Sequence, residues 1–248
     1  MKKIVALLLV VCLLFVGCSA APEAPVQDPE SSISQEQNAV QPETDDAQKE
    51  EAAVQPEIDD TQKEETSVQP SDFDVSAVTA EVVDGGVKYT FAALPQTAAD
   101  ITALLEELPR TDAHNVVALF HAALVRYIES PQDGTAMIDV LRGPQPMSDA
   151  DKSFMEERFS DKKYLPRVYF EGAEPGNDYQ PAEPWCIVIY DDPVAPPEGY
   201  GYVNVTSAGA DNPRRIVTRL KDGEHYLWEY NGALLSVRLP ASEDPWAR

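Results

Sequence analysis

Basic residues are scarce in this sequence, in which 19 lysines and arginines stand against 43 aspartates and glutamates. The formal net charge is -24, and residues 19–72 alone contain 2 basic and 15 acidic residues. Proteins that bind nucleic acid or anionic lipid headgroups need lysine and arginine to displace counterions. We therefore predict that nucleic acid is not a partner and that the surface is acidic and well solvated.

Cysteine is also rare, with residues only at positions 12, 18 and 186. The first two belong to the N-terminal apolar segment, so Cys186 stands alone in the rest of the chain and an internal disulfide is excluded there. Cys186 lies in the apolar run Trp185–Tyr190, which is typical of a buried strand. We predict a packed, unreactive thiol rather than a nucleophile.

Histidine occurs three times, as His114, His121 and His225. His114 and His121 are seven residues apart, about two helical turns, which is too far for joint metal chelation. The zinc-protease, nucleophile-elbow and dithiol motifs are missing as well. We predict no catalytic residue, no metal and no cofactor, with His114 exposed, His121 at the border of an apolar helix face and His225 solvated. The alternative is a general-base role for His121.

Long apolar runs are limited to Ile4–Val16, which follows two lysines and is shorter than the about 20 residues of a transmembrane helix. The run ends in Phe15-Val16-Gly17-Cys18, where a small residue precedes a cysteine as in a bacterial lipobox. We predict a signal peptide over 1–17 and a lipid on Cys18 that anchors the protein to the extracytoplasmic face of the cell membrane. The alternatives are an ordinary secretory signal cut elsewhere and an uncleaved anchor.

Residues 18–72 lack aromatic side chains and have few large aliphatic ones, so they cannot bury a core. A 14-residue unit occurs at 39–52 and again at 53–66, and a truncated third copy begins at Ser67. Units this short, with one or two aliphatic residues each, do not stack into a solenoid. We predict a disordered acidic tether that carries a domain away from the membrane.

Residues 73–248 have the composition of a single globular domain. Asp84–Gly86 predicts a hairpin turn, and the apolar period of 112–129 predicts a long amphipathic helix that ends at a Pro131–Gly134 break. We predict an α+β domain in which N-terminal helices pack on a C-terminal antiparallel, curved sheet. The expected strands are 78–83, 87–91, 167–170, 185–190, 200–206, 215–220, 225–230 and 233–239, and the expected helices are 97–108, 112–129, 135–141 and 148–159.

Two groups of side chains are candidates for ligand binding. Tyr226, Trp228 and Tyr230 share one face of a strand, so they either pack against the helices or line an open face for sugars or an apolar ligand. Asp211 precedes Arg214 and Arg215 in a loop. The two arginines either pair back to that carboxylate in a structured turn or bind an anion.

Several motifs resemble those of an uncharacterised family. They are Tyr169-Phe170-Glu171-Gly172-Ala173, the loop Ser207–Arg215, Tyr226–Tyr230 and Asp244-Pro245-Trp246. Together they are similar to a domain of unknown function found in lipoproteins and secreted proteins of Gram-positive anaerobic bacteria, over roughly 94–246. The resemblance implies no established activity, cofactor or catalytic residue. The order of helices and sheet is also similar to nuclear transport factor 2-like proteins, by analogy of architecture alone.

The function expected from these patterns is that of a non-enzymatic binding or interaction module of the cell envelope. Its partners would be a wall glycan, a peptide or another envelope protein, in addition to the membrane that holds the lipid anchor. The alternative is a hydrolase or other small-ligand enzyme with its pocket on the concave face of the sheet. A structural spacer is the third possibility.

Overall fold

The computed structural model describes residues 71–247, which belong to one compact unit. The predicted signal peptide, the lipidated Cys18 and nearly all of the tether lie outside the described residues. The predictions made for those segments therefore stay predictions.

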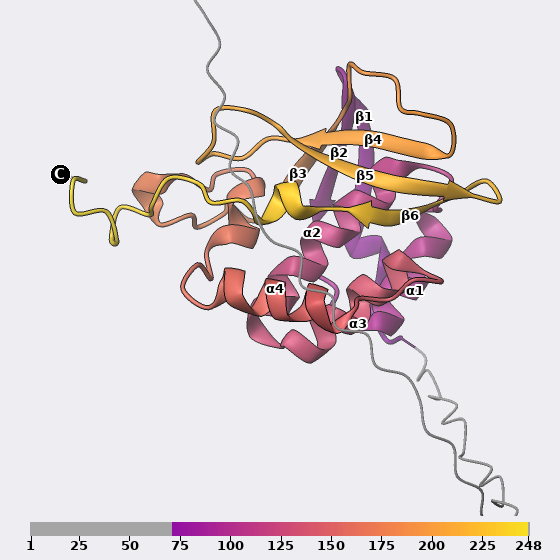
Figure 1. Ribbon diagram of the computed structural model, residues 1–248, viewed down its shortest axis with the longest axis horizontal. Coiled ribbons are helices and arrows are strands. Elements are labelled where there is room, and N and C mark those ends of the chain that lie inside the picture. Colours follow the sequence, from indigo (N-terminus) through magenta and orange to yellow (C-terminus); the bar gives the residue numbers. More distant parts are fainter. Residues whose placement is uncertain (1–70, 248) are drawn as a thin grey trace, which may run out of the picture. The chain divides into compact units, whose positions relative to one another are not determined.

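Six antiparallel strands form one open sheet whose spatial order follows the sequence order (Figure 1). The helices are inserted between β2 and β3, yet these two strands pair along their whole length, from Gly86 opposite Tyr190 to Phe91 opposite Trp185. The chain therefore leaves the sheet, builds the helical layer and returns beside the strand it left. The strands are β1 (Val78–Val83), β2 (Gly86–Phe91), β3 (Trp185–Asp191), β4 (Tyr200–Val205), β5 (Arg214–Lys221) and β6 (Glu224–Glu229).

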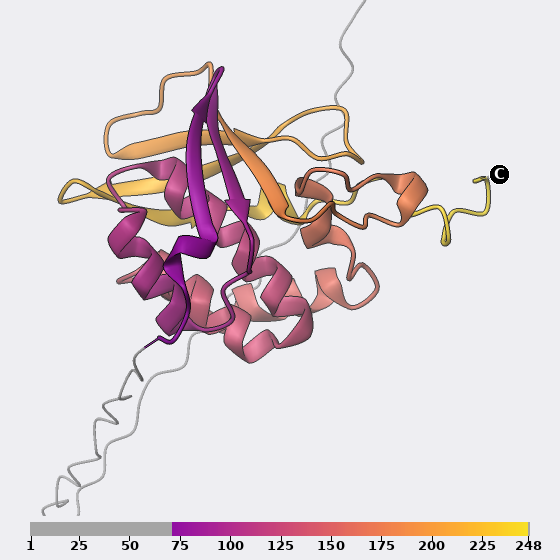
Figure 2. The same cartoon turned by 180° about the vertical axis from the view of Figure 1, so that it is seen from behind.

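The sheet is strongly twisted and has one covered face. In Figure 1 the hairpin of β1 and β2 runs steeply across the direction of β5 and β6, and Figures 1 and 2 show the helices gathered on one side. Strand side chains alternate accordingly: Ile187 and Ile189 are fully buried, whereas Val188 and Tyr190 between and beside them are half-exposed. The α+β prediction is confirmed.

Each of the four helices begins at a side chain that caps it. Thr97 and Ser148 form capping boxes with Asp100 and Asp151, and Asp112 and Ser130 each accept a bond from a first-turn amide. The helices are α1 (Ala98–Glu107), α2 (Ala113–Glu129), α3 (Pro131–Arg142) and α4 (Asp149–Phe159). The expected break at Pro131–Gly134 is wrong: proline fits the first position of a helix, so these residues form the first turn of α3.

Helix α2 is buried on nearly every side. It contacts β2, β3, β4 and β6 on one side and α3 on another, and Val116, Leu119 and Phe120 have no solvent exposure. This confirms that the helix 112–129 crosses the sheet. Because a helix buried all round has no solvated face, the polar residues on it must satisfy their hydrogen bonds inside the protein.

Two expected strands are short 3-10 helices instead. Residues 167–170 fall largely in η2 (Leu165–Tyr169), which has Pro166 in its first turn. The next residue, Glu171, donates its amide hydrogen to the Cys186 carbonyl of β3. Residues 233–239 begin inside η4 (Asn231–Leu234). Beyond it the chain runs against the 207–211 loop, where Arg238 donates its amide hydrogen to Gly209. Helix α3 packs beside β6 at that end of the sheet.

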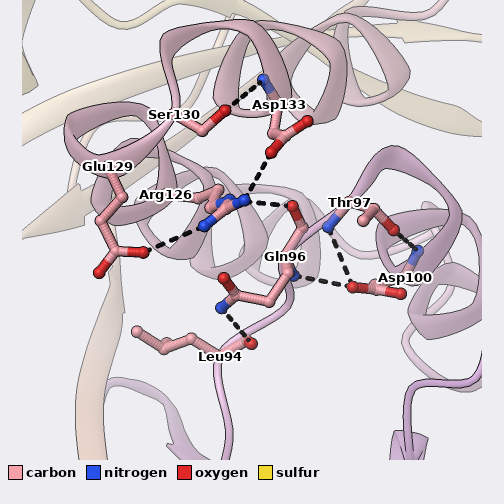
Figure 3. Close-up of polar contacts among 8 residues, drawn as sticks. All are labelled: Leu94, Gln96, Thr97, Asp100, Arg126, Glu129, Ser130 and Asp133. Carbon is pink, nitrogen blue, oxygen red and sulfur yellow. Dashed lines mark hydrogen bonds and ion pairs between the residues drawn. The ribbon is translucent and has the colours of Figure 1, made fainter.

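A polar network centred on Arg126 joins three helices (Figure 3). The guanidinium at the end of α2 donates to the backbone carbonyl of Gln96 before α1 at 3.1 Å and to the Asp133 carboxylate of α3 at 2.5 Å. Asp100 accepts bonds from the amides of Gln96 and Thr97 at 2.8 and 3.0 Å. Burial tends to raise the pKa of Asp100, but these hydrogen bonds outweigh it and lower the pKa.

The crossing of α2 and α3 requires glycine at position 134. A Cβ atom there would lie 2.6 Å from the Cβ and the amide nitrogen of Tyr127, so Gly134→Ala must push the two helices apart. We expect the free energy of unfolding to fall by about 1–3 kcal/mol, despite the better helix propensity of alanine. Urea unfolding measures it, with Gly176→Ala as control because a Cβ at Gly176 meets nothing within 4 Å. Equal stability of the two variants would contradict the prediction.

Candidate functional site

The predicted aromatic row is interrupted: Tyr226 and Trp228 lie in β6, Tyr230 follows its end, and the pairing with β5 shifts in register after Leu227, which is buried in the core. The Tyr226 ring packs directly on Gly143 at the end of α3, and the Arg110 guanidinium lies 5.0 Å from its centroid. Tyr230 is 4% exposed, with its ring 5.0 Å from that of Phe120 in α2. Trp228 between them is half-buried. This geometry gives Tyr226 and Tyr230 packing contacts, and their role in ligand binding stays a prediction.

The arginines of the 207–215 loop do not pair back to Asp211. Arg238, from the C-terminal segment, makes that ion pair instead. Arg215 forms two bonds to Asp192, at 2.6 and 2.8 Å, and its charge holds the pKa of Asp192 below the usual range. Arg214 donates to the Ser236 carbonyl at 3.4 Å. The six predicted residues therefore do not converge on one site, because consecutive strand residues point to opposite faces.

The helix-free face of the sheet carries tyrosines stacked with arginines. The Arg219 guanidinium lies 4.3 Å from the Tyr200 ring centroid, and Arg215 lies 4.5 Å from that of Tyr202. Cys186 is on this face too, partly buried and with its Sγ 3.5 Å from the Thr90 hydroxyl, so the expectation of a strand buried on both faces is wrong, and the lack of reactivity stays a prediction. The strand around it is buried on one face only.

His121 is enclosed in the core. It has no solvent exposure, its Nδ1 lies 2.8 Å from the Val117 carbonyl oxygen, and the ring of Tyr169 covers it with a centroid distance of 4.7 Å. Burial lowers the pKa of His121 to about 4. A histidine without access to solvent or to a cavity has no substrate proton within reach, so the structure does not support it as a general base.

The other two histidines meet at the N-terminal end of α2. His114 Nδ1 lies 2.7 Å from Asp112, and its Nε2 lies 3.1 Å from Asp191 at the end of β3. His225 Nδ1 lies 2.9 Å from the hydroxyl of the buried Thr218. Burial works against the charged form of His114, but both carboxylates outweigh it and raise the pKa. The expectation that His114 is exposed and His225 solvated is wrong, because the strand ends close over the start of the helix.

Three adjoining cavities share Lys163, in the segment between α4 and η2, and we call them together the Lys163 groove. The first, of about 550 Å³, lies among α2, α3 and α4. The second, of about 340 Å³, lies between the end of α2 and Trp185 at the start of β3. The third, of about 300 Å³, is lined by Tyr164 and the C-terminal segment. Lys163 borders all three, so the cavities lie next to one another around this side chain.

The Lys163 groove combines an apolar floor with charges of both signs, because its cavities are bordered by Lys152, Lys163 and Arg167 and also by Glu129, Glu156, Asp161, Asp178 and Glu243. Tyr127, Ile128 and Phe159 line the first cavity, and Ile128 with Trp185 lines the second. Lys163 and Arg167 stand over the junction of the second and third cavities. Within residues 71–247 neither of these cations makes an ion pair. Unpaired cations beside an apolar groove, in a domain of acidic composition, are suited to hold an anionic group of a ligand.

The sequence interpretation missed the groove. Lys162, Lys163 and Arg167 are close together in a chain that is otherwise acidic, and that local charge was the available signal. The apolar floor comes from segments up to about 90 residues apart, from Leu94 to Trp185, so no local pattern marks it. Among residues 71–247, no group of three or more His, Cys, Asp and Glu side chains is placed to hold a metal ion.

Comparison with known proteins identifies one family. A family described as a domain of unknown function, DUF6935, matches residues 93–241. No curated protein matches the sequence, and no solved structure matches the fold. The likeness to nuclear transport factor 2-like proteins thus stays an analogy. None of the helices formed by residues 71–247 is long and apolar enough to cross a membrane.

Burial of neutral His121 predicts a loss of stability in mild acid. Its folded-state pKa of about 4 lies below the ordinary 6.5, so stability is present above pH 6.5 and falls as the pH falls toward 4. We expect the free energy of unfolding to drop by about 2 kcal/mol from pH 6.5 to 5, and His121→Gln to lose this slope. His114→Gln is the control: folding raises the pKa of His114, so the stability that this residue contributes is lost mainly as the pH rises above 6.5. Urea unfolding at the two pH values measures the slope, and an unchanged slope in His121→Gln would refute the assignment.

Proposed function

This chain belongs to the DUF6935 family of domains of unknown function, and we propose that it is a membrane-anchored extracytoplasmic lipoprotein whose domain is a non-enzymatic binding module of the cell envelope. The Lys163 groove is the binding surface in this proposal. Its ligand is an elongated molecule with apolar groups for the floor and an anionic group for Lys163 and Arg167.

The observation that carries the proposal is that several cavities lie next to one another around Lys163. A small-molecule site is usually one concave pocket that encloses its ligand. Here cavities of about 550, 340 and 300 Å³ follow one another around a single lysine. A surface of this form suits a ligand that lies along it, such as a chain with repeated contacts. The cavity beside Phe91, of about 360 Å³, adjoins the second through Leu94 and Trp185 and lengthens the surface further.

The sequence supports the envelope location. The lipobox at Phe15–Cys18 provides the anchor, and the acidic, proline-containing tether at 18–72 provides reach. An unstructured chain of that length spans at least roughly 40 Å, and its charge extends it. A tethered binding domain at that distance meets wall material and other envelope proteins rather than cytoplasmic partners.

The alternative of a pocket enzyme has little support from the described residues. His121, its candidate base, is fully buried, and it borders none of the four cavities. The pair of His225 and Thr218 has nucleophile–base spacing, but Thr218 has no solvent exposure and donates its hydroxyl to Gly201 or His225. A nucleophile must reach a substrate carbonyl, and Thr218 borders none of the four cavities.

The lipid anchor is tested at Cys18. In a bacterium that carries out lipoprotein processing, we expect the wild-type chain to incorporate labelled fatty acid and to sediment with membranes. Cys18→Ala should lose the label and pass to the soluble or secreted fraction, because only a thiol at that position accepts the diacylglycerol. Cys12→Ala, the same change inside the signal, is the matched control. A labelled Cys18→Ala protein would disprove lipidation at this site.

The groove is tested by charge reversal. Lys163→Glu should weaken binding of the purified protein to isolated cell envelopes by about tenfold, since it replaces an attractive charge with a repulsive one. Lys221→Glu makes the same change in the exposed turn between β5 and β6, where the lysine lies 3.7 Å from Asp222 and borders none of the cavities. Sedimentation with envelopes gives both affinities. Equal affinities of the two variants would exclude the groove as the binding surface.

A further inference from the structure

The third cavity of the Lys163 groove is polar, unlike the other two. It is lined by serine, aspartate, glutamate, lysine, arginine and tyrosine side chains, with Pro240 as the one apolar residue. Lys163 and Arg167 also border the second cavity, whereas Asp178, Ser242 and Glu243 border only the third. Positive charge therefore lies on the side that adjoins the second cavity, which we call the mouth, and negative charge lies on the other side, where Ser242 and Glu243 are exposed. The acidic side is held together by a bond of 2.8 Å from the Ser242 amide to Asp178.

Tyr164 brings an unpartnered hydroxyl to this cavity. The residue is 4% exposed, and its ring stacks on Tyr179 at a centroid distance of 5.4 Å with planes 13° apart. Tyr179 is held in turn by a bond of 2.7 Å from its hydroxyl to the Arg238 carbonyl. The Tyr164 hydroxyl is buried and has no hydrogen-bond partner among the described residues. A buried polar group in this state costs free energy, which a ligand that bonds to it recovers.

The groups around that hydroxyl are suited to a cation. Asp161 and Glu243 line the same cavity as Tyr164. Burial raises the pKa of Tyr164, and the negative charges of Glu243 and Asp161 raise it further. Asp161 is paired with Lys162, at 2.8 Å, but within residues 71–247 Glu243 has no ion pair. An ammonium group donates three hydrogen bonds. The tyrosine hydroxyl and the two carboxylates are acceptors for it.

The mouth of the cavity is suited to an anion. Arg167 has a buried Nε atom without a hydrogen-bond partner among the described residues, and Lys163 stands beside it. A free anion would have to approach a domain of net negative charge, which repels it over a Debye length of about 8 Å. A ligand that carries both charges is neutral overall and avoids this repulsion. The arrangement of one acidic and one basic end thus favours a zwitterion.

We propose that the third cavity binds the free amino terminus of a peptide, with the ammonium group at Tyr164 and Glu243 and a carboxylate of the first residues at Lys163 and Arg167. The rest of the peptide lies along the groove, where Trp185 and Ile128 contact its apolar side chains. This inference rests on the proposed binding function and names its ligand class. Lys163 and Arg167 border the second cavity as well as the third. A peptide bound at the third cavity therefore continues into the second, whereas a single amino acid would fill the third cavity alone.

The test uses the peptide Ala-Glu-Leu amide, which has one ammonium and one carboxylate, in calorimetric titrations of the purified protein. Acetylation of its amino terminus should weaken binding at least tenfold, and replacement of its glutamate by glutamine should do the same. Glu243→Gln should weaken binding of the free peptide about tenfold and leave the acetylated peptide unchanged. Lys163→Gln should weaken binding of both.

Tyr164→Phe is the sharpest variant, because it removes only the unpartnered hydroxyl and keeps the ring on Tyr179. The unliganded protein should be no less stable than wild type, while affinity for the free peptide falls severalfold. Tyr230→Phe is the matched control: its hydroxyl is also buried without a partner among the described residues, but it lies away from the groove and should not affect binding.

The possible outcomes separate the inference from the proposed function. If free and acetylated peptides bind equally and both depend on Lys163, the amino-terminal site is wrong and the groove stands. If no peptide binds while envelopes still bind through Lys163, the peptide class is wrong and the binding function stands. If neither peptides nor envelopes bind, both proposals fail. Selective loss of the free peptide in Glu243→Gln and Tyr164→Phe supports the inference.

Discussion

The burial of α2 on nearly all sides is the constraint on which the rest of the domain depends. A helix with apolar residues around its whole circumference needs neighbours in every direction, so the sheet covers one side and α3 another. This explains why the helices are inserted between β2 and β3 and why the sheet has a single buried face. The same burial keeps His121 away from any substrate, because this residue in the middle of α2 has no solvent exposure.

The Lys163 groove exists where this packing ends. At the C-terminal end of α2, Ile128 is only partly buried and Tyr127, a core residue, borders the first cavity; residues of α4 and η2 line the first and second cavities. Cations at this opening act locally in a domain of acidic composition. At physiological ionic strength, charges more than about 8 Å apart are largely screened. The potential inside the groove therefore depends on Lys163 and Arg167 together with the carboxylates that border it, and the net charge influences which ligands approach.

Features set by neighbouring residues were predictable. The capping residues Thr97, Asp112 and Ser148 and the turn at Asp84–Gly86 act over a few residues, so sequence pattern alone locates the helices and the first hairpin. Residues 167–170 and 233–239 have strand composition but form single turns of 3-10 helix at their N-terminal ends. Residues of high strand propensity form a strand only beside a partner strand, and in this fold neither segment pairs with one of the six strands.

The sequence by itself determined the acidic character and the α+β class, because composition and periodicity are local properties. Only the tertiary structure decided which face of β6 meets the helices, that Asp211 pairs with Arg238, and that Tyr164 and Glu243 line one cavity with Lys163. Those relations join segments far apart in the chain. They depend on how α2 is covered, and no local pattern encodes that.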